Sequence, residues 1–272
     1  MPIRMIAADL DDTLLDPRGL ITERTKAAVR EAIRRNCIFV PASGRMPAAM
    51  RDIAEELQIN GAVIAFNGAL TTDLFTGRDI VRMPVRHDLA VEAALMAEER
   101  GAHVQLYKDG TYYYKDENIY AGRYARALGI PGHAVGEKMS EWFSGDADKI
   151  LIVNEKENIA LWAQDFRQHF AGRLNCAISK PTYLEIFSRH ADKGEALKAY
   201  SESLGIDRDE TAAFGDGEND MSMIEFAGHG YVMANASAAL LARAPYTAPS
   251  NAVDGLARVL EHWFSDGMIP EV

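Results

Sequence analysis

The sequence predicts an α/β fold, in which a core of parallel strands and crossover helices is interrupted by an α+β module. Two observations predict this fold. Strand-like and helix-like segments alternate in the first third of the 272-residue chain and again from about residue 192, as expected for a parallel sheet. The middle of the chain instead carries short aromatic-rich runs, including Tyr112-Tyr113-Tyr114. A chain of this length has room for one large domain or two modest ones.

The first third is expected to contribute three strands and two helices to the core. Apolar runs with the length of buried strands lie at residues 5–8, 37–42 and 62–65. Segment 22–36 has a helical composition. The candidate buried positions of this helix are Ala27, Ala28, Ala32 and Ile33. Pro47 suits a first helical turn and opens a second helix through about residue 57.

The rest of the chain is interpreted in the same way. A helix over about 88–100 ends at Gly101, and the runs 104–107 and 111–114 flank an Asp-Gly turn that is typical of a hairpin. Further strands are expected at 149–153, 175–178, 183–187, 211–214 and 231–233. Further helices are expected near 122–128, 159–170, 193–204 and 253–264. The predicted boundaries are a core domain of residues 1–82 and 189–272 and an inserted α+β domain of residues 83–188.

Composition excludes several classes of function. The net charge is −11, which disfavours a nucleic-acid binder because such a protein needs clustered Lys and Arg to neutralise phosphates. An anionic small substrate is still possible, since a local cation or a metal can override net charge. No apolar run is long enough to cross a bilayer, and the N-terminal residues do not resemble a signal peptide. Cys37 and Cys176 show no metal-ligand spacing, so we expect a cytoplasmic, reduced protein without membrane association.

An acidic pair directly follows the first expected strand. Asp9 and Asp11 stand in Asp9-Leu10-Asp11-Asp12-Thr13, and a carboxylate is costly to bury unless it is paired or bound to a metal. Such a pair could hold Mg²⁺ and present a nucleophile, or it could be a solvated loop that caps a helix. A calcium-binding EF-hand is excluded, because Leu14 and Leu20 occupy the positions that require Gly and Glu.

Two other strand ends carry polar, glycine-containing loops. Ser43-Gly44-Arg45 follows the second strand, and a loop with three acids, running from Gly215 to Asp220, follows a strand in the last third. Ligands of open parallel sheets bind beyond the carboxyl ends of the strands, so these loops could converge on one phosphate site. Lys193 stands at the start of an expected helix, where a cation is mildly unfavourable, which favours a ligand role. The acids would repel one another without a cation, and a metal shared with Asp9 would remove that cost.

Taken together, these motifs resemble the haloacid dehalogenase (HAD) superfamily of phosphatases, and most closely the Cof-type subfamily with a large inserted cap, type IIB. The matching segments occur in the family's order and are Asp9 to Leu15, Ser43-Gly44-Arg45, Asn67-Gly68-Ala69, Lys193-Gly194 and Gly215 to Met221. The resemblance implies a Rossmann-like parallel-sheet core with an inserted α+β cap domain. Asp12 and Ser43 stand where Gly and Thr are commoner in the superfamily, and neither change removes a reactive group.

The resemblance also implies roles for individual residues. Asp9 would be the nucleophile and Asp11 the general acid and base. Mg²⁺ would be held by the Asp9 carboxylate, the Asp11 backbone carbonyl and Asp216, with Asp220 supporting Lys193 or a metal-bound water. The phosphoryl group or the substrate would be bound by Ser43, Gly44, Lys193 and Asn219. Arg45 could pair with a structural acid or reach the substrate.

The expected function is therefore a Mg²⁺-dependent phosphatase that hydrolyses small phosphorylated metabolites, such as sugar phosphates or phosphorylated cofactors, through an aspartyl-phosphate intermediate. A phosphomutase of the same superfamily is the alternative, and a non-catalytic metabolite sensor is a third hypothesis. The expected binding partner is a small phosphorylated substrate. We expect the protein to be a monomer or a small homo-oligomer. We expect the inserted cap to exclude water and to select the leaving group.

Overall fold

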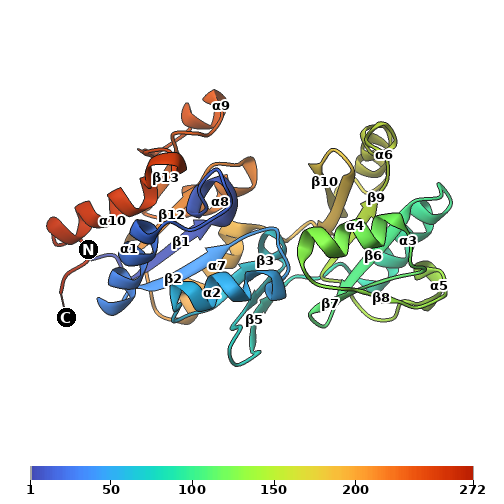
Figure 1. The fold of residues 1–272 in the computed structure, drawn as a ribbon, viewed down its shortest axis with the longest axis horizontal. Coiled ribbons are helices and arrows are strands. Elements are labelled where there is room, and N and C mark those ends of the chain that lie inside the picture. Colours follow the sequence, from blue (N-terminus) through green and yellow to red (C-terminus); the bar gives the residue numbers. More distant parts are fainter. Residues whose placement is uncertain (1, 272) are drawn as a thin grey trace. The chain divides into compact units, whose positions relative to one another are not determined.

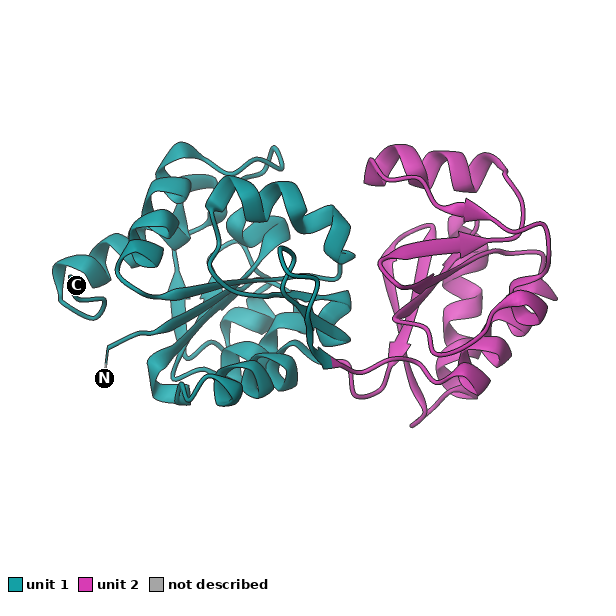
Figure 2. Ribbon diagram, turned by 90° about the horizontal axis from the view of Figure 1, so that it is seen from below, with its two compact units in different colours: residues 1–81, 192–272 teal, residues 82–191 magenta. Residues whose placement is uncertain are grey.

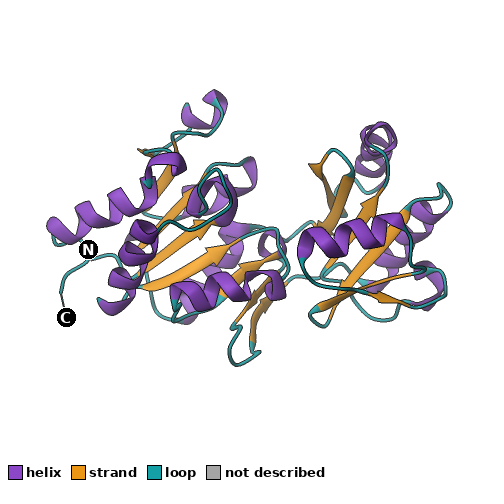
Figure 3. Cartoon of the chain, viewed as in Figure 1, coloured by secondary structure: helices purple, strands orange, loops and turns teal. Residues whose placement is uncertain are grey.

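The computed structural model describes residues 2–271, which form two compact units (Figure 2). The core unit comprises the chain up to Val81 and from Asp192 onward, and the inserted unit comprises Arg82–Ala191. Each unit is built around a sheet of its own (Figure 3). Within residues 2–271, no helix combines the length and apolarity needed to cross a bilayer.

The core sheet has eight strands in the order β14-β13-β12-β1-β2-β3-β4-β5. Figure 1 shows β12, β1 and β2 side by side in this sheet. From β14 to β3 each neighbouring pair is parallel, and β4 pairs antiparallel with β3. Its strands are β1 (Met5–Asp9), β2 (Ile38–Ala42), β3 (Val63–Ala65), β4 (Leu70–Thr72), β5 (Asp79–Arg82), β12 (Thr211–Gly215), β13 (His229–Met233) and β14 (Tyr246–Ala248). Because β1 and β12 are adjacent and parallel, the loops that follow them leave the same edge of the sheet.

Helices cover both faces of the core sheet. Met5 and Ala7 of β1 belong to an apolar cluster with residues of α7 and α8. On the other face, the Phe214 ring of β12 lies 5.8 Å from the Trp263 ring of α10. The core helices are α1 (Glu23–Arg34), α2 (Arg51–Leu57), α7 (Lys193–Ser203), α8 (Met221–Phe226), α9 (Ala238–Leu241) and α10 (Gly255–Ser265). This layered parallel sheet confirms the predicted α/β fold class.

The inserted unit contains a mixed sheet in the order β10-β11-β9-β6-β7-β8, in which only the β7–β8 pair is parallel. Its strands are β6 (His103–Lys108), β7 (Thr111–Tyr114), β8 (His133–Ala134), β9 (Lys149–Val153), β10 (Leu174–Lys180) and β11 (Tyr183–Ser188). The predicted hairpin is present, and Asp109 and Gly110 both have positive φ in its turn.

The two faces of this sheet differ in chemistry. Apolar residues such as Leu106, Ile150 and Ile152 form one core with the helices of that face. Tyr107 and its alternating neighbours lie on the opposite face, where the Tyr107 hydroxyl donates to the Tyr124 hydroxyl of α4 at 2.5 Å. The helices of this unit are α3 (His87–Glu98), α4 (Ile119–Leu128), α5 (Met139–Trp142) and α6 (Lys156–His169).

Some local expectations were wrong. Ala27 is exposed and Ile33 only half-buried, because the buried face of α1 is formed by Thr25, Ala28, Val29 and Ala32 at the helical spacing of three and four residues. The helix expected to open at Pro47 begins as a 3₁₀ turn, Pro47–Met50, and becomes α-helical at Arg51. The short strands β4, β5 and β14 were not anticipated, since runs of three or four residues carry little periodicity.

Candidate active site

The turn after β1 places two aspartates in different environments. Asp9 is the last residue of β1 and only 7% exposed. In the turn Leu10–Leu14, the buried Leu10 and Leu14 anchor both ends, while Asp11 and Asp12 are exposed. Asp12 has φ 58°, a left-handed conformation that Asp tolerates better than most residues. A hydrogen bond from the Leu15 N–H to the Leu10 carbonyl, at 2.8 Å, closes this turn.

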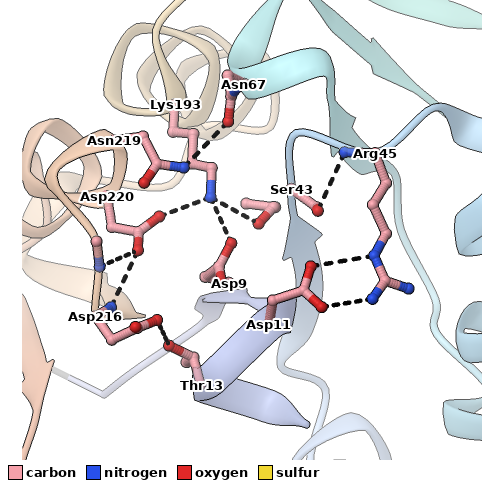
Figure 4. A network of polar contacts seen from close by, with 12 residues as sticks. Asp9, Asp11, Thr13, Ser43, Arg45, Asn67, Lys193, Asp216, Asn219 and Asp220 are labelled. Carbon is pink, nitrogen blue, oxygen red and sulfur yellow. Dashed lines mark hydrogen bonds and ion pairs between the residues drawn. The ribbon is translucent and has the colours of Figure 1, made fainter. Parts of the chain in front are cut away.

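Lys193 reaches Asp9 from the opposite side of the site, at the first residue of α7 (Figure 4). Its side chain is completely buried, and its Nζ donates to Asp9 Oδ1 at 2.5 Å, to Asp220 Oδ1 at 2.6 Å and to the Ala42 carbonyl at 3.1 Å. The three donors of the ammonium group therefore have three acceptors. A lysine at a helix start is unfavourable, and here two carboxylates compensate for that position.

Gly194 allows α7 to approach α8 closely enough for this contact. A Cβ on Gly194 would lie 2.5 Å from the backbone carbonyl carbon of Ser222 in α8. Ser222 Oγ in turn accepts a hydrogen bond from the Gly194 N–H at 3.1 Å. The Lys193-Gly194 pair recognised in the sequence thus combines a buried cation with the small residue that lets its helix pack.

The loop after β12 holds Asp216 and Asp220 in different ways. Asp220 Oδ2 accepts hydrogen bonds from the backbone N–H groups of Asp216 and Gly217, at 3.0 and 2.9 Å. Its Oδ1 accepts from Lys193, so both oxygens of Asp220 have partners. Asp216 Oδ1 accepts from the Thr13 hydroxyl at 2.9 Å. Asp220 therefore fixes the loop, and the carboxylate of Asp216 remains accessible to a further ligand.

Burial and mutual repulsion raise the pKa values of two carboxyl groups in this acidic cluster. Burial raises the pKa of Asp9 to about 7, and Asp220 and Asp216 add to the effect although Lys193 opposes it. Burial also raises the pKa of Asp216 to about 6, against the hydrogen bond from Thr13. The pKa of Lys193 is raised, because Asp220 and Asp9 together outweigh the burial that disfavours its charge. A single lysine does not balance three carboxylates.

The donor set fits a divalent metal ion. Asp9, Asp216 and Asp220 each offer a carboxylate oxygen, and these oxygens lie within 4.8 Å of one another. Carboxylate oxygen ligands are what Mg²⁺ and other hard cations prefer. Because both Asp220 oxygens already accept hydrogen bonds, Asp9 and Asp216 are the better direct ligands of the three.

The remaining predicted site residues surround this cluster in the core unit (Figure 4). Ser43 is buried, and its Oγ accepts from the backbone N–H of Arg45 at 3.2 Å. A Cβ on Gly44 would lie 3.0 Å from the Asn67 side chain. The exposed Asn219 donates to Asn67 Oδ1 at 3.1 Å. The structure thus brings the three strand-end loops together, and the turn at Asn67 joins them.

Arg45 does not contact Asp9. Its Nε and Nη2 donate to the two carboxylate oxygens of Asp11, at 3.1 and 2.5 Å. The roles expected from the sequence were a pairing with a structural acid or a contact with the substrate, whereas the structure pairs Arg45 with an acid of the site itself. That acid is the residue expected to act as general acid and base.

Sequence reasoning missed two residues of the site. Thr13 orients Asp216, and Asn67 holds Asn219. Both stand inside motifs that were recognised, Asp9 to Leu15 and Asn67-Gly68-Ala69, but neither was given a role. Phe66, Asn67 and Gly68 all have positive φ, so this turn is set by backbone conformation that the Asn-Gly signal only partly indicates.

A cavity of about 340 Å³ lies elsewhere, within the inserted unit. It is lined by residues of α3, β6, α4 and α5 and of the loops between them, among them His103, Asn118 and Tyr120. None of the predicted site residues lines it, so it is separate from the acidic cluster.

Known proteins resemble this chain in sequence and in fold. The family model of haloacid dehalogenase-like hydrolases matches residues 6–260. A Streptococcus pyogenes protein is 30% identical over 97% of this chain and 99% of its own length. The 5-amino-6-(5-phospho-D-ribitylamino)uracil phosphatase of Bacillus subtilis is 28% identical, with 96% of each chain covered. A crystal structure from Thermotoga maritima superimposes with a TM-score of 0.85, at 28% identity, and covers 96% of this chain and 97% of its own.

The parallel α/β core, the carboxylates at its strand ends and the buried lysine at the start of α7 together form a site with a donor set that suits a divalent metal. The chain belongs to the haloacid dehalogenase-like hydrolases. The resemblance recognised from the motifs is therefore confirmed.

Proposed function

We propose that this protein is a Mg²⁺-dependent phosphatase that hydrolyses small phosphorylated metabolites through an aspartyl-phosphate formed on Asp9. One observation carries the proposal: a fully buried lysine bridges Asp9 and Asp220, and Asp216 completes a carboxylate cluster within 4.8 Å. The Bacillus subtilis relative, named as a phosphatase of a phosphorylated ribitylaminouracil, supports a small phosphorylated metabolite as the substrate class.

Mg²⁺ would be held by the carboxylates of Asp9 and Asp216 and by the backbone carbonyl of Asp11. When bound, it supplies positive charge that neutralises the carboxylates and stabilises charge on the transferring phosphoryl group. Asp220 supports this arrangement indirectly, because its oxygens hold Lys193 and the backbone of the Asp216 loop.

In the first step, a carboxylate oxygen of Asp9 attacks phosphorus, and the bond from phosphorus to the leaving oxygen breaks. Asp11 donates a proton to the leaving oxygen, which departs as an alcohol. Lys193 and the Ser43 hydroxyl bind the phosphoryl oxygens, together with the Gly44 backbone and Asn219. Preorganised donors of this kind are effective because phosphoryl transfer depends mainly on electrostatic stabilisation.

In the second step, Asp11 accepts a proton from a water molecule whose oxygen attacks the phosphorus of the aspartyl-phosphate. The bond to the Asp9 oxygen breaks, which regenerates the Asp9 carboxylate and releases inorganic phosphate. The inserted unit, proposed here as a cap of residues 83–188, would exclude bulk water from the first step and contact the leaving group.

The decisive variant is Asp9→Asn, which keeps the shape of the side chain and removes the nucleophile. We expect it to abolish release of phosphate from p-nitrophenyl phosphate with Mg²⁺ while the melting temperature stays close to that of wild type. Asp12→Asn is a matched control, because Asp12 is an exposed aspartate of the same turn with φ 58°, which Asn also tolerates. Near-wild-type turnover by Asp9→Asn would contradict the mechanism.

A panel of phosphorylated metabolites, scored both for free phosphate and for isomeric sugar phosphates, would identify the substrate class. Free phosphate is the result expected of a phosphatase. An isomeric sugar phosphate formed without phosphate release would instead indicate a phosphomutase.

A further inference from the structure

The turn Phe66–Gly68 follows β3 and has an unusual backbone conformation. Its three residues all have positive φ, at 52°, 54° and 97°. Glycine adopts this region freely and asparagine tolerates it, whereas a bulky residue such as Phe66 rarely does. Strained backbone persists only where its surroundings hold it, and it clusters at functional sites. The turn contains the recognised Asn67-Gly68 pair, to which the proposed mechanism gives no role.

The turn is bound to the loop that carries Ser43. The backbone N–H of Asn67 donates to the Ser43 carbonyl at 3.0 Å, and the N–H of Phe66 donates to the Arg45 carbonyl at 3.1 Å. A Cβ on Gly44 would lie 3.0 Å from the Asn67 side chain, so this side chain packs directly on the loop. The turn is therefore fixed relative to the proposed phosphoryl ligands at Ser43 and Gly44.

Gly68 brings the turn against the start of α7. A Cβ on Gly68 would overlap the backbone carbonyl group of Asp192 and lie 2.8 Å from its nitrogen. Asp192 directly precedes Lys193, and its side chain caps α7 by accepting from the Gly194 N–H at 2.8 Å. Backbone atoms of a capped helix cannot move aside as a flexible side chain can. The close approach of Gly68 therefore fixes the backbone before Lys193.

The backbone after Lys193 is fixed by a second close contact. Gly194 packs on the backbone of Ser222 in α8, so Lys193 stands between two glycine contacts. From this position its side chain extends to Asp9, with Nζ 2.5 Å from Asp9 Oδ1. A shift of the start of α7 would therefore move the ammonium group relative to Asp9.

Asn67 also holds Asn219, in the loop after β12. Asn219 Nδ2 donates to Asn67 Oδ1 at 3.1 Å (Figure 4), and Asn219 Oδ1 would lie 2.5 Å from a Cβ on Gly217. An amide nitrogen carries two hydrogens, so the second can donate to a phosphoryl oxygen. Because Asn219 is exposed, its amide would sample several rotamers without such a partner.

We propose that the Asn67-Gly68 turn positions the groups that bind the phosphoryl oxygens. Gly68 sets the position of Lys193, and Asn67 sets that of Asn219, both relative to the loop of Ser43. The turn acts on the reaction only through these residues. The inference rests on the proposed function, because it assumes that Lys193, Ser43 and Asn219 bind the phosphoryl group.

The first experiment removes the Asn67 side chain alone. Asn67→Gly keeps the backbone N–H and a residue that accepts φ 54°. We expect the dissociation constant of inorganic phosphate, titrated calorimetrically into the Mg²⁺-loaded protein, to rise by about 3- to 10-fold, as for the loss of one hydrogen bond. Asn36→Gly is the matched control, because Asn36 is an exposed asparagine of the core unit with φ 65°. It should leave the constant unchanged.

A double-mutant cycle separates positioning from general damage. In an Asn219→Ala background, Asn67→Gly should weaken phosphate binding no further, since the contact that it supports is already absent. Damage to the turn as a whole would instead weaken binding by the same factor in both backgrounds.

The second experiment places a side chain against the Asp192 backbone. We expect Gly68→Ala to lower kcat/KM for p-nitrophenyl phosphate by about 100-fold, because a displacement of about 1 Å at a reacting group can cost that much. Gly77→Ala is the control for the cost of alanine at positive φ. Gly77 has φ 70°, and no atom of the described residues, its chain neighbours aside, lies within 4 Å of a Cβ there. This control should keep kcat/KM close to that of wild type.

Two results would overturn the inference. One is a phosphate affinity that is equal in Asn67→Gly and Asn36→Gly, or that falls additively in the cycle. The other is equal activity of Gly68→Ala and Gly77→Ala. If Gly68→Ala does not fold, the Asn67→Gly cycle alone decides. Failure of the proposed function has a different signature, since it would appear as turnover by Asp9→Asn or as wild-type protein that releases phosphate from no ester.

Discussion

Lys193 Nζ lies 2.6 Å from Asp220 Oδ1, and both side chains are almost completely shielded from solvent. The same ammonium group contacts Asp9. Removing one member of a buried ion pair leaves an uncompensated charge, which costs far more than losing a surface pair. The pair therefore links the stability of the core unit to the chemistry proposed for Asp9.

Lys193→Met should lower the free energy of unfolding by about 3 kcal/mol near neutral pH, because Asp9 and Asp220 would remain buried without their cation. Urea denaturation measures the change. Lys198→Met is the control, since Lys198 is an exposed lysine of the same helix and should have little effect. Equal stability of the two variants would show that Lys193 does not compensate the carboxylates.

Metal-free protein should lose stability as the pH rises through the range of Asp216. Burial raises the pKa of Asp216 from 3.8 to about 6 in the folded state, so the folded protein binds more protons than the unfolded chain between these values. The stabilisation is therefore present below about pH 4 and lost above about pH 6. Asp216→Asn lacks this dependence, and its free energy of unfolding should rise relative to wild type by ~2 kcal/mol from about pH 4 to pH 8. A constant difference in urea denaturation would refute the prediction.

Mg²⁺ should stabilise the folded protein more strongly at high pH than at low pH. It binds the ionised carboxylates, so protons compete with it at low pH. We expect the rise in melting temperature caused by MgCl₂ to be larger at about pH 8 than at about pH 5, since Asp9 and Asp216, with pKa values of about 7 and about 6, are then ionised. The rise should disappear in Asp216→Asn. An increase that is independent of pH would argue against carboxylate ligands.

Thr13→Val should weaken metal binding while preserving shape. The Thr13 hydroxyl donates to Asp216 Oδ1 at 2.9 Å, and Thr13 is 2% exposed. Groups that orient a metal ligand typically change metal affinity by about 10- to 100-fold when removed. We expect the Mg²⁺ concentration for half-maximal hydrolysis of p-nitrophenyl phosphate to rise by about tenfold, with Thr13→Ser close to wild type. If Val and Ser behave alike, the hydroxyl does not orient Asp216.

Substitution by alanine should change the stability of the protein in opposite directions at two helical glycines. In Gly194→Ala, the new Cβ would lie 2.5 Å from Ser222 backbone, which should destabilise the core unit by about 1–3 kcal/mol and displace Lys193. In Gly122→Ala, the nearest atom would be an Arg126 nitrogen at 3.6 Å. That change should stabilise α4 by ~1 kcal/mol, because Ala is the better helix former. Denaturation of both variants measures the contrast, and destabilisation by Gly122→Ala would contradict it.

The longer elements were predictable because their signals are local. The strand at 149–153 and the hairpin around Asp109-Gly110 occur where the sequence predicts them. The buried face of α1 was not predictable, since Ala27 and Ala28 are the same residue type. Only the packing of the helix shows that Ala28 is the buried one. Strand β14 pairs with β13 through just three residues, too few for a periodic pattern.

The sequence alone determined which residue types stand at the strand ends, because a parallel strand followed by a turn fixes the edge of the sheet from which Asp9, Ser43 and Asp216 emerge. Tertiary structure decided which of these groups meet. The contact of Lys193 with Asp9 joins residues 184 positions apart, and the contact of Arg45 with Asp11 depends on rotamers that no local pattern encodes. Side-chain partners are set by how helices and loops pack on the sheet, so the pairing of proton donor and arginine became visible only in three dimensions.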